Sequence, residues 1–183
     1  MSESKKLIVG ETMPDFTFDS PFHKGLSLYE EIKDSTKTAI LFLRYYGCTL
    51  CQYDIHVLSK NHTEITSNGG KILVVLQSKP ETIAKDINED SLPFTIICDP
   101  TMHLYQQFDI QPAKSKMEMA DALTMMKITK ATALGFKHGE YEGDEMQLPA
   151  SFVVLPNGEI TYTHYGKSVS DIPSVGELKE LLG

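Results

Sequence analysis

The sequence predicts an α/β fold in which a central mixed β-sheet is flanked by helices and the chain ends in a β-hairpin plus a helix. Two continuous apolar runs, residues 38–43 and 71–77, enclose a segment with helical periodicity, which is typical of a parallel β-α-β unit. A Cys-x-x-Cys motif, Cys48 to Cys51, stands where the first run passes into the helix. Pro156-Asn157-Gly158 is a tight-turn signal between two later strand patterns, and it predicts the terminal hairpin.

Length and composition suit one globular domain that spans residues 1–183. The 17 basic and 25 acidic residues give a net charge of −8. This argues against nucleic acid or an anionic membrane as a partner, because both require a basic face. No apolar run approaches the roughly 20 residues of a membrane span. Residues 1–15 lack the hydrophobic segment of a signal peptide, so we expect a cytoplasmic protein.

The first half of the chain alternates strand and helix patterns. A helix at 27–32 is predicted by Ser27 as its N-cap, with Glu30 three residues later. Asn68-Gly69-Gly70 is a helix-stop signal. The other expected elements of this half are a short strand at 14–18, a strand at 38–44, a helix from the Cys-x-x-Cys motif to about Ser67, and a strand at 71–77.

The second half ends in a helix that Ser174 and Glu177 start, because their spacing is that of a capping box. The helical stretch at 114–134 is rich in methionine. We expect these methionines to pack in the core, and an adaptable partner surface is the alternative. The other expected elements of this half are a helix opened by Pro80 and running to about residue 90, a strand at 94–98, a short helix at 101–108, a polar loop at 135–147, and strands at 151–155 and 159–165.

The position of the Cys-x-x-Cys motif gives it chemical meaning. The first turn of a helix carries unpaired backbone N–H groups and the positive end of the helix dipole. Both favour a thiolate, so the pKa of a cysteine there falls below the free value of about 8.5. Thr49 and Gln52 have capping-box spacing, which predicts Thr49 as the N-cap. The motif thus helps to define the start of its own helix.

The order of these elements is that of a thioredoxin-like fold. The stretches GETMPDFTF, FLRYYGCTLC and QLPASFVVLPNGEITYTHYGKSVSDIPSV also resemble the peroxiredoxin-like branch, of the Cys-x-x-Cys type, of the alkyl hydroperoxide reductase/thiol-specific antioxidant family. The resemblance implies redox chemistry at Cys48 and Cys51 with no bound cofactor. It also implies a thioredoxin-like or small-thiol electron donor, a disulfide or hydroperoxide substrate, and an assembly that can be a homodimer.

Two assignments of the attacking thiol are open. In thioredoxin-like proteins the first cysteine attacks. We favour Cys48 for this role, because we expect its sulfur at the solvent edge and that of Cys51 under the first helical turn. The peroxiredoxin motif Pro-x-x-x-Thr/Ser-x-x-Cys instead ends on Cys51. Arg44 then takes the proline position and Cys48 the hydroxyl position. Helix position also favours Cys51, which stands at N2 if Thr49 is the N-cap.

Three further residues are candidates for supporting the site. Arg44, the only arginine of the chain, either stabilises a thiolate or faces a carboxylate elsewhere. Asp54 would oppose ionisation of Cys51, but we expect it on a solvated helix face. By resemblance, Pro149 is the cis-proline that packs against the Cys-x-x-Cys motif in thioredoxin-like proteins. A trans-proline at the entry to a strand is the alternative.

Cys98 ends an apolar strand, and we expect it to be a small buried hydrophobe rather than a resolving thiol. A zinc site at the Cys-x-x-Cys motif would need two more ligands. Neither Cys98 nor the six histidines form a second paired motif, so we expect no metal.

Together these features predict a thiol–disulfide oxidoreductase that cycles between a Cys48–Cys51 dithiol and disulfide. A thiol peroxidase acting on hydroperoxides is the enzymatic alternative. A non-catalytic redox sensor or binding protein that uses the methionine-rich helix is the third hypothesis.

Overall fold

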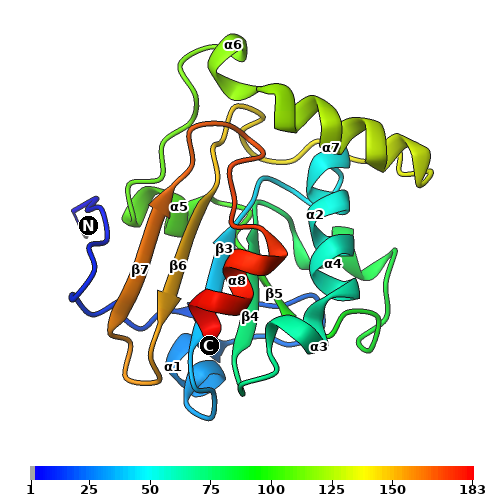
Figure 1. Ribbon diagram of the computed structural model, residues 1–183. Helices are drawn as coiled ribbons and strands as arrows, with labels where there is room; N and C mark the ends of the chain where they lie inside the picture. The colour runs from blue at the N-terminus through cyan, green and yellow to red at the C-terminus, as the bar shows by residue number, and fades with distance from the viewer. Residues whose placement is uncertain (1–2) are drawn as a thin grey trace.

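The computed structural model describes residues 3–183 and is built on a five-stranded sheet with the strand order β5-β4-β3-β6-β7 (Figure 1). β3, β4 and β5 are parallel, β6 is antiparallel to β3, and β7 is antiparallel to β6. The predicted α/β class with a mixed sheet is therefore confirmed. The strands span Thr38–Phe42 (β3), Lys71–Leu76 (β4), Thr95–Cys98 (β5), Ala150–Val154 (β6) and Ile160–Tyr165 (β7), and a separate antiparallel pair is formed by Thr17–Phe18 (β1) and Leu26–Ser27 (β2).

The continuous apolar runs become the central strands because both faces of the sheet are covered. Every residue of β3 is buried. One apolar core lies between the sheet and α2 (Thr49–Lys60), α3 (His62–Ile65), α4 (Pro80–Ala84) and α8 (Val175–Leu182). A second core lies under α1 (Leu28–Ile32) and α5 (His103–Gln107) on the other face. This layering positions the end of β3 and the start of α2 in the interior of the molecule.

Two helix starts follow the predicted caps. The hydroxyl of Ser27 accepts a hydrogen bond from the Glu30 N–H at the start of α1. Ser174 and Glu177 form the full capping box at the start of α8, with donor–acceptor distances of 3.2 and 2.7 Å. Each cap satisfies N–H groups that the helix cannot pair, which is why these short sequence patterns are reliable signals.

The helix predicted for 114–134 is two helices, α6 (Lys116–Met119) and α7 (Ala122–Ala133). Ala120 is extended, and Asp121 caps α7 by accepting the Thr124 N–H, so a local cap interrupts the helical pattern. The helix expected up to Ser67 divides at Asn61, and the helix that Pro80 opens ends at Ala84. The strand expected at 14–18 is reduced to β1.

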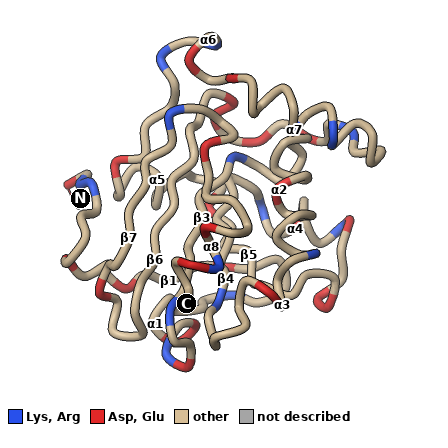
Figure 2. Tube along the Cα trace, in the orientation of Figure 1, with Lys and Arg blue, Asp and Glu red and all other residues tan. Residues whose placement is uncertain are grey.

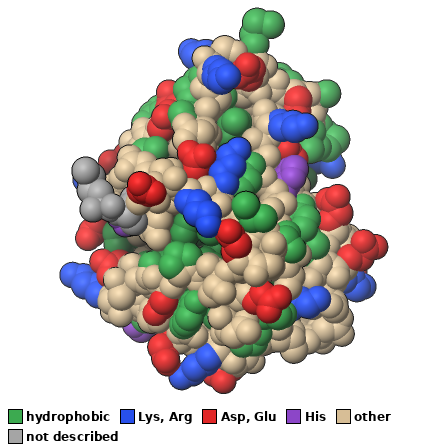
Figure 3. Space-filling view, turned by 90° about the vertical axis from the view of Figure 1, so that its left-hand side faces the viewer, with side chains coloured by type: hydrophobic (Ala, Val, Ile, Leu, Met, Phe, Trp, Pro, Cys, Tyr) green, Lys and Arg blue, Asp and Glu red, His purple; other side chains and the backbone are tan. Residues whose placement is uncertain are grey.

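Among residues 3–183, no helix is long and apolar enough to cross a membrane. Figure 2 shows acidic and basic residues interspersed along the helices and loops rather than gathered in one basic tract. The face drawn in Figure 3 carries hydrophobic side chains scattered among charged ones, and one hydrophobic side chain protrudes at the top, where α6 lies.

Candidate active site

Cys48 lies where the chain that leaves β3 enters α2. It is the N-cap of α2, because its backbone is extended, with φ −66° and ψ 122°, and its sulfur accepts the Cys51 N–H at 3.4 Å. The prediction of Thr49 as the N-cap is therefore wrong. The sulfur of Cys48 takes the place of the capping oxygen, so Thr49 is the first helical residue and Cys51 stands at N3 rather than N2.

Arg44 points toward the dithiol. One guanidinium nitrogen, Nη2, lies 2.9 Å from the Cys48 sulfur, and the other, Nη1, donates to the Glu145 carbonyl at 2.6 Å. Of the two alternatives that the sequence left open, the structure places Arg44 at the thiol rather than at a carboxylate. The only arginine of the chain thus joins the Cys-x-x-Cys turn to a segment 101 residues away.

The pKa values of the two thiols are shifted in opposite directions. The pKa of Cys48 is lowered to about 6, first by the hydrogen bond from the Cys51 thiol and then by the Arg44 charge and the Cys51 N–H, which together outweigh burial. The pKa of Cys51 is raised well above its usual value by burial and by the thiolate beside it. At neutral pH, these shifts leave Cys48 as the thiolate, while Cys51 holds its proton.

Both sulfurs are enclosed, which corrects the expectation that Cys48 lies at the solvent edge. The exposed fractions of Cys48 and Cys51 are 1% and 3%. Residues 136–147, which we name the strap, lie against the Cys-x-x-Cys turn. The Gly139 N–H donates to the Gly47 carbonyl at 2.8 Å, and an added Cβ on Gly47 would lie 2.8 Å from the Glu140 nitrogen. Because Gly47 and Gly139 have no side chains, the backbone of the strap can approach the backbone of the Cys-x-x-Cys turn closely.

Other contacts attach the strap around the site. Gln52 donates to the carbonyls of Gly47 and Lys137 at 3.1 and 2.9 Å. Glu142 accepts the N–H of Lys79 and the hydroxyl of Thr82, at 2.9 and 3.1 Å. The strap is therefore fastened to the start of α2, to Arg44 and to the start of α4.

Tyr45, His138 and Glu145 form a polar cluster that the sequence did not indicate. The buried Tyr45 hydroxyl lies 3.0 Å from His138 Nε2 and donates to Glu145 Oε1 at 3.3 Å. The pKa of Tyr45 is raised by burial and by the Cys48 charge. Because Tyr45 and its partners are 93 and 100 residues apart, no local pattern could have paired them.

Asp54 is buried, so the expected solvated position is wrong. Its carboxylate accepts from Lys127 Nζ at 2.8 Å, with side-chain exposures of 4% for Asp54 and 13% for Lys127. Burial raises the pKa of Asp54 to about 6, while Lys127 opposes the shift. Lys127 belongs to α7. Because α7 packs over this side of α2, Asp54 is buried rather than exposed on the surface of the helix.

The Leu148–Pro149 peptide bond is trans, so the predicted cis-proline is wrong. Pro149 leads directly into β6, whose first residue, Ala150, pairs with Phe42 of β3. Its carbonyl accepts the Gly166 N–H at 2.8 Å, so the chain enters the sheet in the ordinary extended way. A trans bond is also the intrinsically favoured isomer of X–Pro.

Cys98 is the last residue of β5 and is buried, as expected. Burial raises the pKa of its thiol to about 12, and the charges of Asp19, Glu142 and Glu81 add to the shift. Within residues 3–183, no group of three or more His, Cys, Asp or Glu side chains could hold a metal ion.

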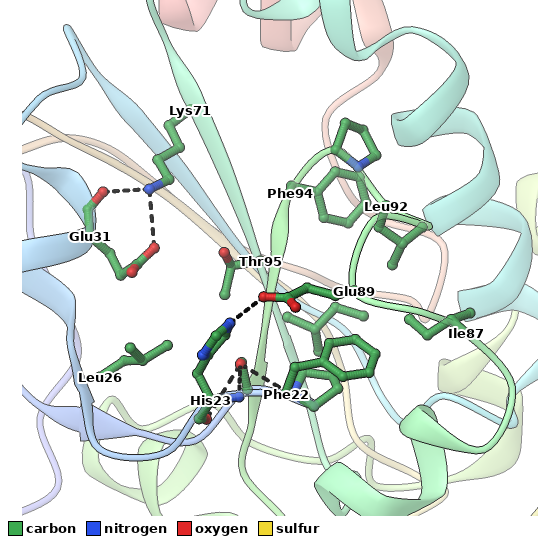
Figure 4. Close-up of a pocket in the computed structure, with 14 residues that line it drawn as sticks. Phe22, His23, Leu26, Glu31, Lys71, Ile87, Glu89, Leu92, Phe94 and Thr95 are labelled. Carbon is green, nitrogen blue, oxygen red and sulfur yellow. Dashed lines mark hydrogen bonds and ion pairs between the residues drawn. The ribbon is translucent and has the colours of Figure 1, made fainter.

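A cavity of about 470 Å³ lies away from the dithiol, between the turn at Ser20–His23 and the segment that leads into β5. Figure 4 shows Phe22, Leu92 and Phe94 among its walls and the His23–Glu89 ion pair across it. Its described lining contains none of the site residues discussed above. It is a feature separate from the thiol chemistry.

The sheet order, and a Cys-x-x-Cys turn at the start of the helix after the central strand, define a protein with the thioredoxin-like fold. The chain belongs to the AhpC/TSA family, whose model matches residues 9–163. This family and fold are those of thiol peroxidases and thiol–disulfide oxidoreductases.

Individual relatives agree with this assignment. The chain is 23% identical to "Peroxiredoxin-like 2C" of Takifugu rubripes over 169 residues, which cover 85% of this chain and 74% of that protein. Its structure matches the thiol peroxidase from Chromobacterium violaceum with a TM-score of 0.65 at 12% identity, covering 99% and 89% of the two chains. It also matches a putative thiol:disulfide interchange protein DsbE from Chlorobium tepidum, with a TM-score of 0.61 at 15% identity, covering 97% and 100%. These structural likenesses show the fold.

Proposed function

We propose that this protein is a thiol-dependent peroxidase that reduces small hydroperoxides with the Cys48–Cys51 dithiol. The observation that carries the proposal is the pairing of the Cys48 sulfur with Arg44 at 2.9 Å and with the Cys51 N–H at 3.4 Å. These donors hold a thiolate at Cys48 in the reduced protein. A thiolate is the form that attacks peroxide oxygen and disulfide sulfur.

The proposed reduction of a hydroperoxide takes place in three steps. The Cys48 thiolate attacks the distal oxygen of the hydroperoxide, the O–O bond breaks, and the alkoxide takes a proton to leave as an alcohol. Cys48 is then a sulfenic acid. Cys51 attacks its sulfur and displaces water, which forms the Cys48–Cys51 disulfide. Two electrons and two protons from an external thiol donor restore the dithiol.

The environment of Cys51 fits the resolving role. Its pKa is raised first by burial and then by its hydrogen bond to the Cys48 thiolate and by the charge of that thiolate. Oxidation of Cys48 to a neutral sulfenic acid removes the last two causes. Cys51 therefore becomes easier to ionise at the moment when its attack is required.

The enclosure of the sulfurs favours a small substrate. A folded protein disulfide can reach sulfurs whose exposed fractions are 1% and 3% only if the strap moves away, whereas a hydroperoxide is small enough to need a much smaller opening. This is why we now place the peroxidase ahead of a protein-disulfide oxidoreductase. The peroxiredoxin motif, with Arg44 and Cys48 at its proline and hydroxyl positions, would make Cys51 the nucleophile. We assign the attack to Cys48 instead, because the pKa of Cys48 is lowered and that of Cys51 is raised.

A second candidate is exchange with a small disulfide. The observation in its favour is that Cys48 replaces the hydroxyl with which the peroxiredoxin motif orients the peroxide. The same Cys48 thiolate would attack a disulfide sulfur, and Cys51 would resolve the mixed disulfide. The two candidates differ only in the oxidant.

The test uses Cys48→Ser and Cys51→Ser with three oxidants: a hydroperoxide, a small disulfide and an insulin-type protein disulfide. We expect the Cys51→Ser protein to form a Cys48 sulfenic acid in one turnover with hydroperoxide, detected with dimedone by mass spectrometry. Cys48→Ser should be inert. Turnover of wild type with the small disulfide alone would favour the second candidate. Peroxide consumption by Cys48→Ser, with the sulfenic acid on Cys51, would overturn the assignment of the nucleophile.

The same proposal indicates the electron donor and the cellular compartment of the reaction. The donor is a thioredoxin-like protein or a small thiol, and the dithiol chemistry fits a reducing cytoplasm. Gel filtration with light scattering decides whether the protein is a homodimer.

A further inference from the structure

The large hydrophobic side chains that are exposed gather near one end of the molecule. Among residues 3–183, most of those exposed on the surface fall between 117 and 141. Met117 on α6 is the extreme case, with an exposed fraction of 91%. Monomeric proteins rarely leave such a group uncovered without a use for it. The group consists of Met117, Leu123, Met125, Met126, Ile128, Leu134 and Tyr141.

The large apolar residues of α7 are exposed, while its buried positions carry small or polar side chains. Leu123, Met126 and Leu134 follow one another at helical spacing and are all exposed, whereas the buried positions are Thr124 and Ala131. A surface helix ordinarily has the opposite arrangement, with its apolar stripe on the core. We name the set Met117, Leu123, Met126 and Leu134 the α6–α7 face.

Polar contacts hold α7 in place without that face. Lys127 bonds to Asp54 of α2 at 2.8 Å and to the Ser170 carbonyl at 3.2 Å. Thr124 donates to the Ser170 hydroxyl at 2.9 Å. These contacts fasten the helix through its buried side and leave about half of the Leu123 and Met126 surfaces exposed. They remain available to a partner, and methionine adapts well to a partner surface.

The α6–α7 face lies beside the dithiol. α7 packs against α2, and Figure 1 shows it crossing near the end of α2 that begins at the Cys-x-x-Cys turn. The chain continues from α7 into the strap, where Lys137 accepts from Gln52 and Gly139 donates to Gly47. A protein seated on this face would therefore stand at the rim of the redox site.

The charge around the face differs in sign from that of the whole chain. Residues 114–137 contain five lysines, at 114, 116, 127, 130 and 137. Lys127 is paired with the buried Asp54, so the other four lysines stand against Glu118 and Asp121, a net of +2 in a chain of −8. Lysines beside an apolar face favour a partner with an acidic surface, since charge complementarity steers association.

We infer that the α6–α7 face docks a protein thiol donor with an acidic surface, which reduces the Cys48–Cys51 disulfide. This inference rests on the proposed function for the existence of that disulfide. A donor thiolate attacks one sulfur, the Cys48–Cys51 bond breaks, and a mixed disulfide forms. The second donor thiol displaces it, so that the donor leaves as a disulfide, Cys51 regains its proton, and Cys48 returns as the thiolate while its proton passes to water. Docking on a face beside the site explains how a large donor can reduce enclosed sulfurs. The strap must move away from the disulfide, and the docked donor is then already close to it.

The test follows a single reduction of the preformed Cys48–Cys51 disulfide, which requires no peroxide turnover. Reduced thioredoxin and dithiothreitol serve as the two donors, and thiols are counted by quenching, alkylation and mass spectrometry. The variants are Met117→Glu and the pair Leu123→Glu with Met126→Glu. The matched control is Ile8→Glu with Val9→Glu, whose wild-type residues are 56% and 55% exposed.

We expect the face variants to lower the second-order rate constant with thioredoxin by about tenfold or more, with the rate for dithiothreitol unchanged. The control should match wild type, and added salt should slow only the thioredoxin reaction. Equal rates for face variants and control, or an equal loss with dithiothreitol, would overturn the inference. So would a wild-type oligomer that Met117→Glu dissociates, or vesicle binding that it abolishes. Failure of the proposed function is a separate result, because it appears as absent peroxide consumption in wild type.

Discussion

Cys48 and Cys98 make an instructive pair, because both lie near the carboxyl end of a parallel strand and both are buried. Cys48 lies beyond β3 and Cys98 ends β5. The pKa of the Cys48 thiol is lowered to about 6, while that of Cys98 is raised to about 12. Similar burial at the same end of one sheet thus gives two thiols of opposite character.

The difference lies in the groups that face each sulfur. Cys48 has the Arg44 guanidinium at 2.9 Å, the Cys51 N–H at 3.4 Å and the Cys51 thiol as a donor. Cys98 has the negative charges of Asp19, Glu142 and Glu81 in its surroundings. Burial alone disfavours a thiolate, and only donors aimed at the sulfur reverse this. Reactivity therefore follows the neighbours of a cysteine rather than its exposure.

Removing the cation should make Cys48 resemble Cys98. At pH 7 a thiol with a pKa of about 6 is about nine-tenths ionised, whereas one with its usual pKa of 9.0 is about one-hundredth ionised. We expect Arg44→Met to slow alkylation of Cys48 by iodoacetamide at pH 7 by about tenfold, because the Cys51 donors remain. Arg44→Lys should fall between, because it keeps the charge without the planar fork. An unchanged alkylation rate in Arg44→Met would show that the thiol and the N–H of Cys51 ionise Cys48 without the arginine.

The same shift has a definite sign in stability. Because the folded-state pKa of Cys48 lies below its unfolded value, the thiolate stabilises the fold fully above about pH 9, and this contribution is lost as the pH falls through about 6. The free energy of unfolding of wild type should therefore rise relative to that of Cys48→Ser between pH 6 and 9. Chemical denaturation at several pH values measures this. A constant difference would contradict the lowered pKa.

Displacing the strap should expose the Cys48 thiol while its donors at the start of α2 remain in place. This separates the effect of enclosure from that of the neighbouring donors in the comparison with Cys98. A Cβ on Gly47 would collide with backbone of the strap at Glu140. We expect Gly47→Ala to reduce stability by about 2 kcal/mol and to speed proteolysis of the strap. Gly176→Ala is the control, since nothing lies within 4 Å of its added Cβ and alanine suits α8. Equal protease resistance in the two variants would mean that the strap tolerates the added methyl group.

The smallest expected effect is that of Cys98→Ala. It should lower stability by about 1 kcal/mol through the lost packing of a buried sulfur and leave redox turnover intact. The measurements are a denaturation curve and the turnover rate with each oxidant. Loss of turnover with an unchanged denaturation curve would make Cys98 a resolving thiol and remove the contrast with Cys48.

Local chemistry made much of the fold predictable from the sequence. The apolar runs of β3 and β4, the caps at Ser27 and Ser174, and the turn before β7 depend on a few adjacent residues. The split of the 114–134 helix was missed although its signal was local. Asp121 can accept the N–H of Thr124, and this competes with a continuous helix at Ala120.

By itself, the sequence determined the thioredoxin-like order of elements, the place of Cys48 and Cys51 at a helix start, and the single arginine nearby. Tertiary structure alone decided that Arg44 faces the sulfur, that the strap encloses both thiols, that Asp54 is interior, and that Pro149 is trans. The first three depend on contacts with residues 127–145, far along the chain. The groups that lower the pKa of Cys48 lie within four residues of it, but the burial of a side chain is set by the distant segment that packs against it, and no local sequence pattern shows which segment that is.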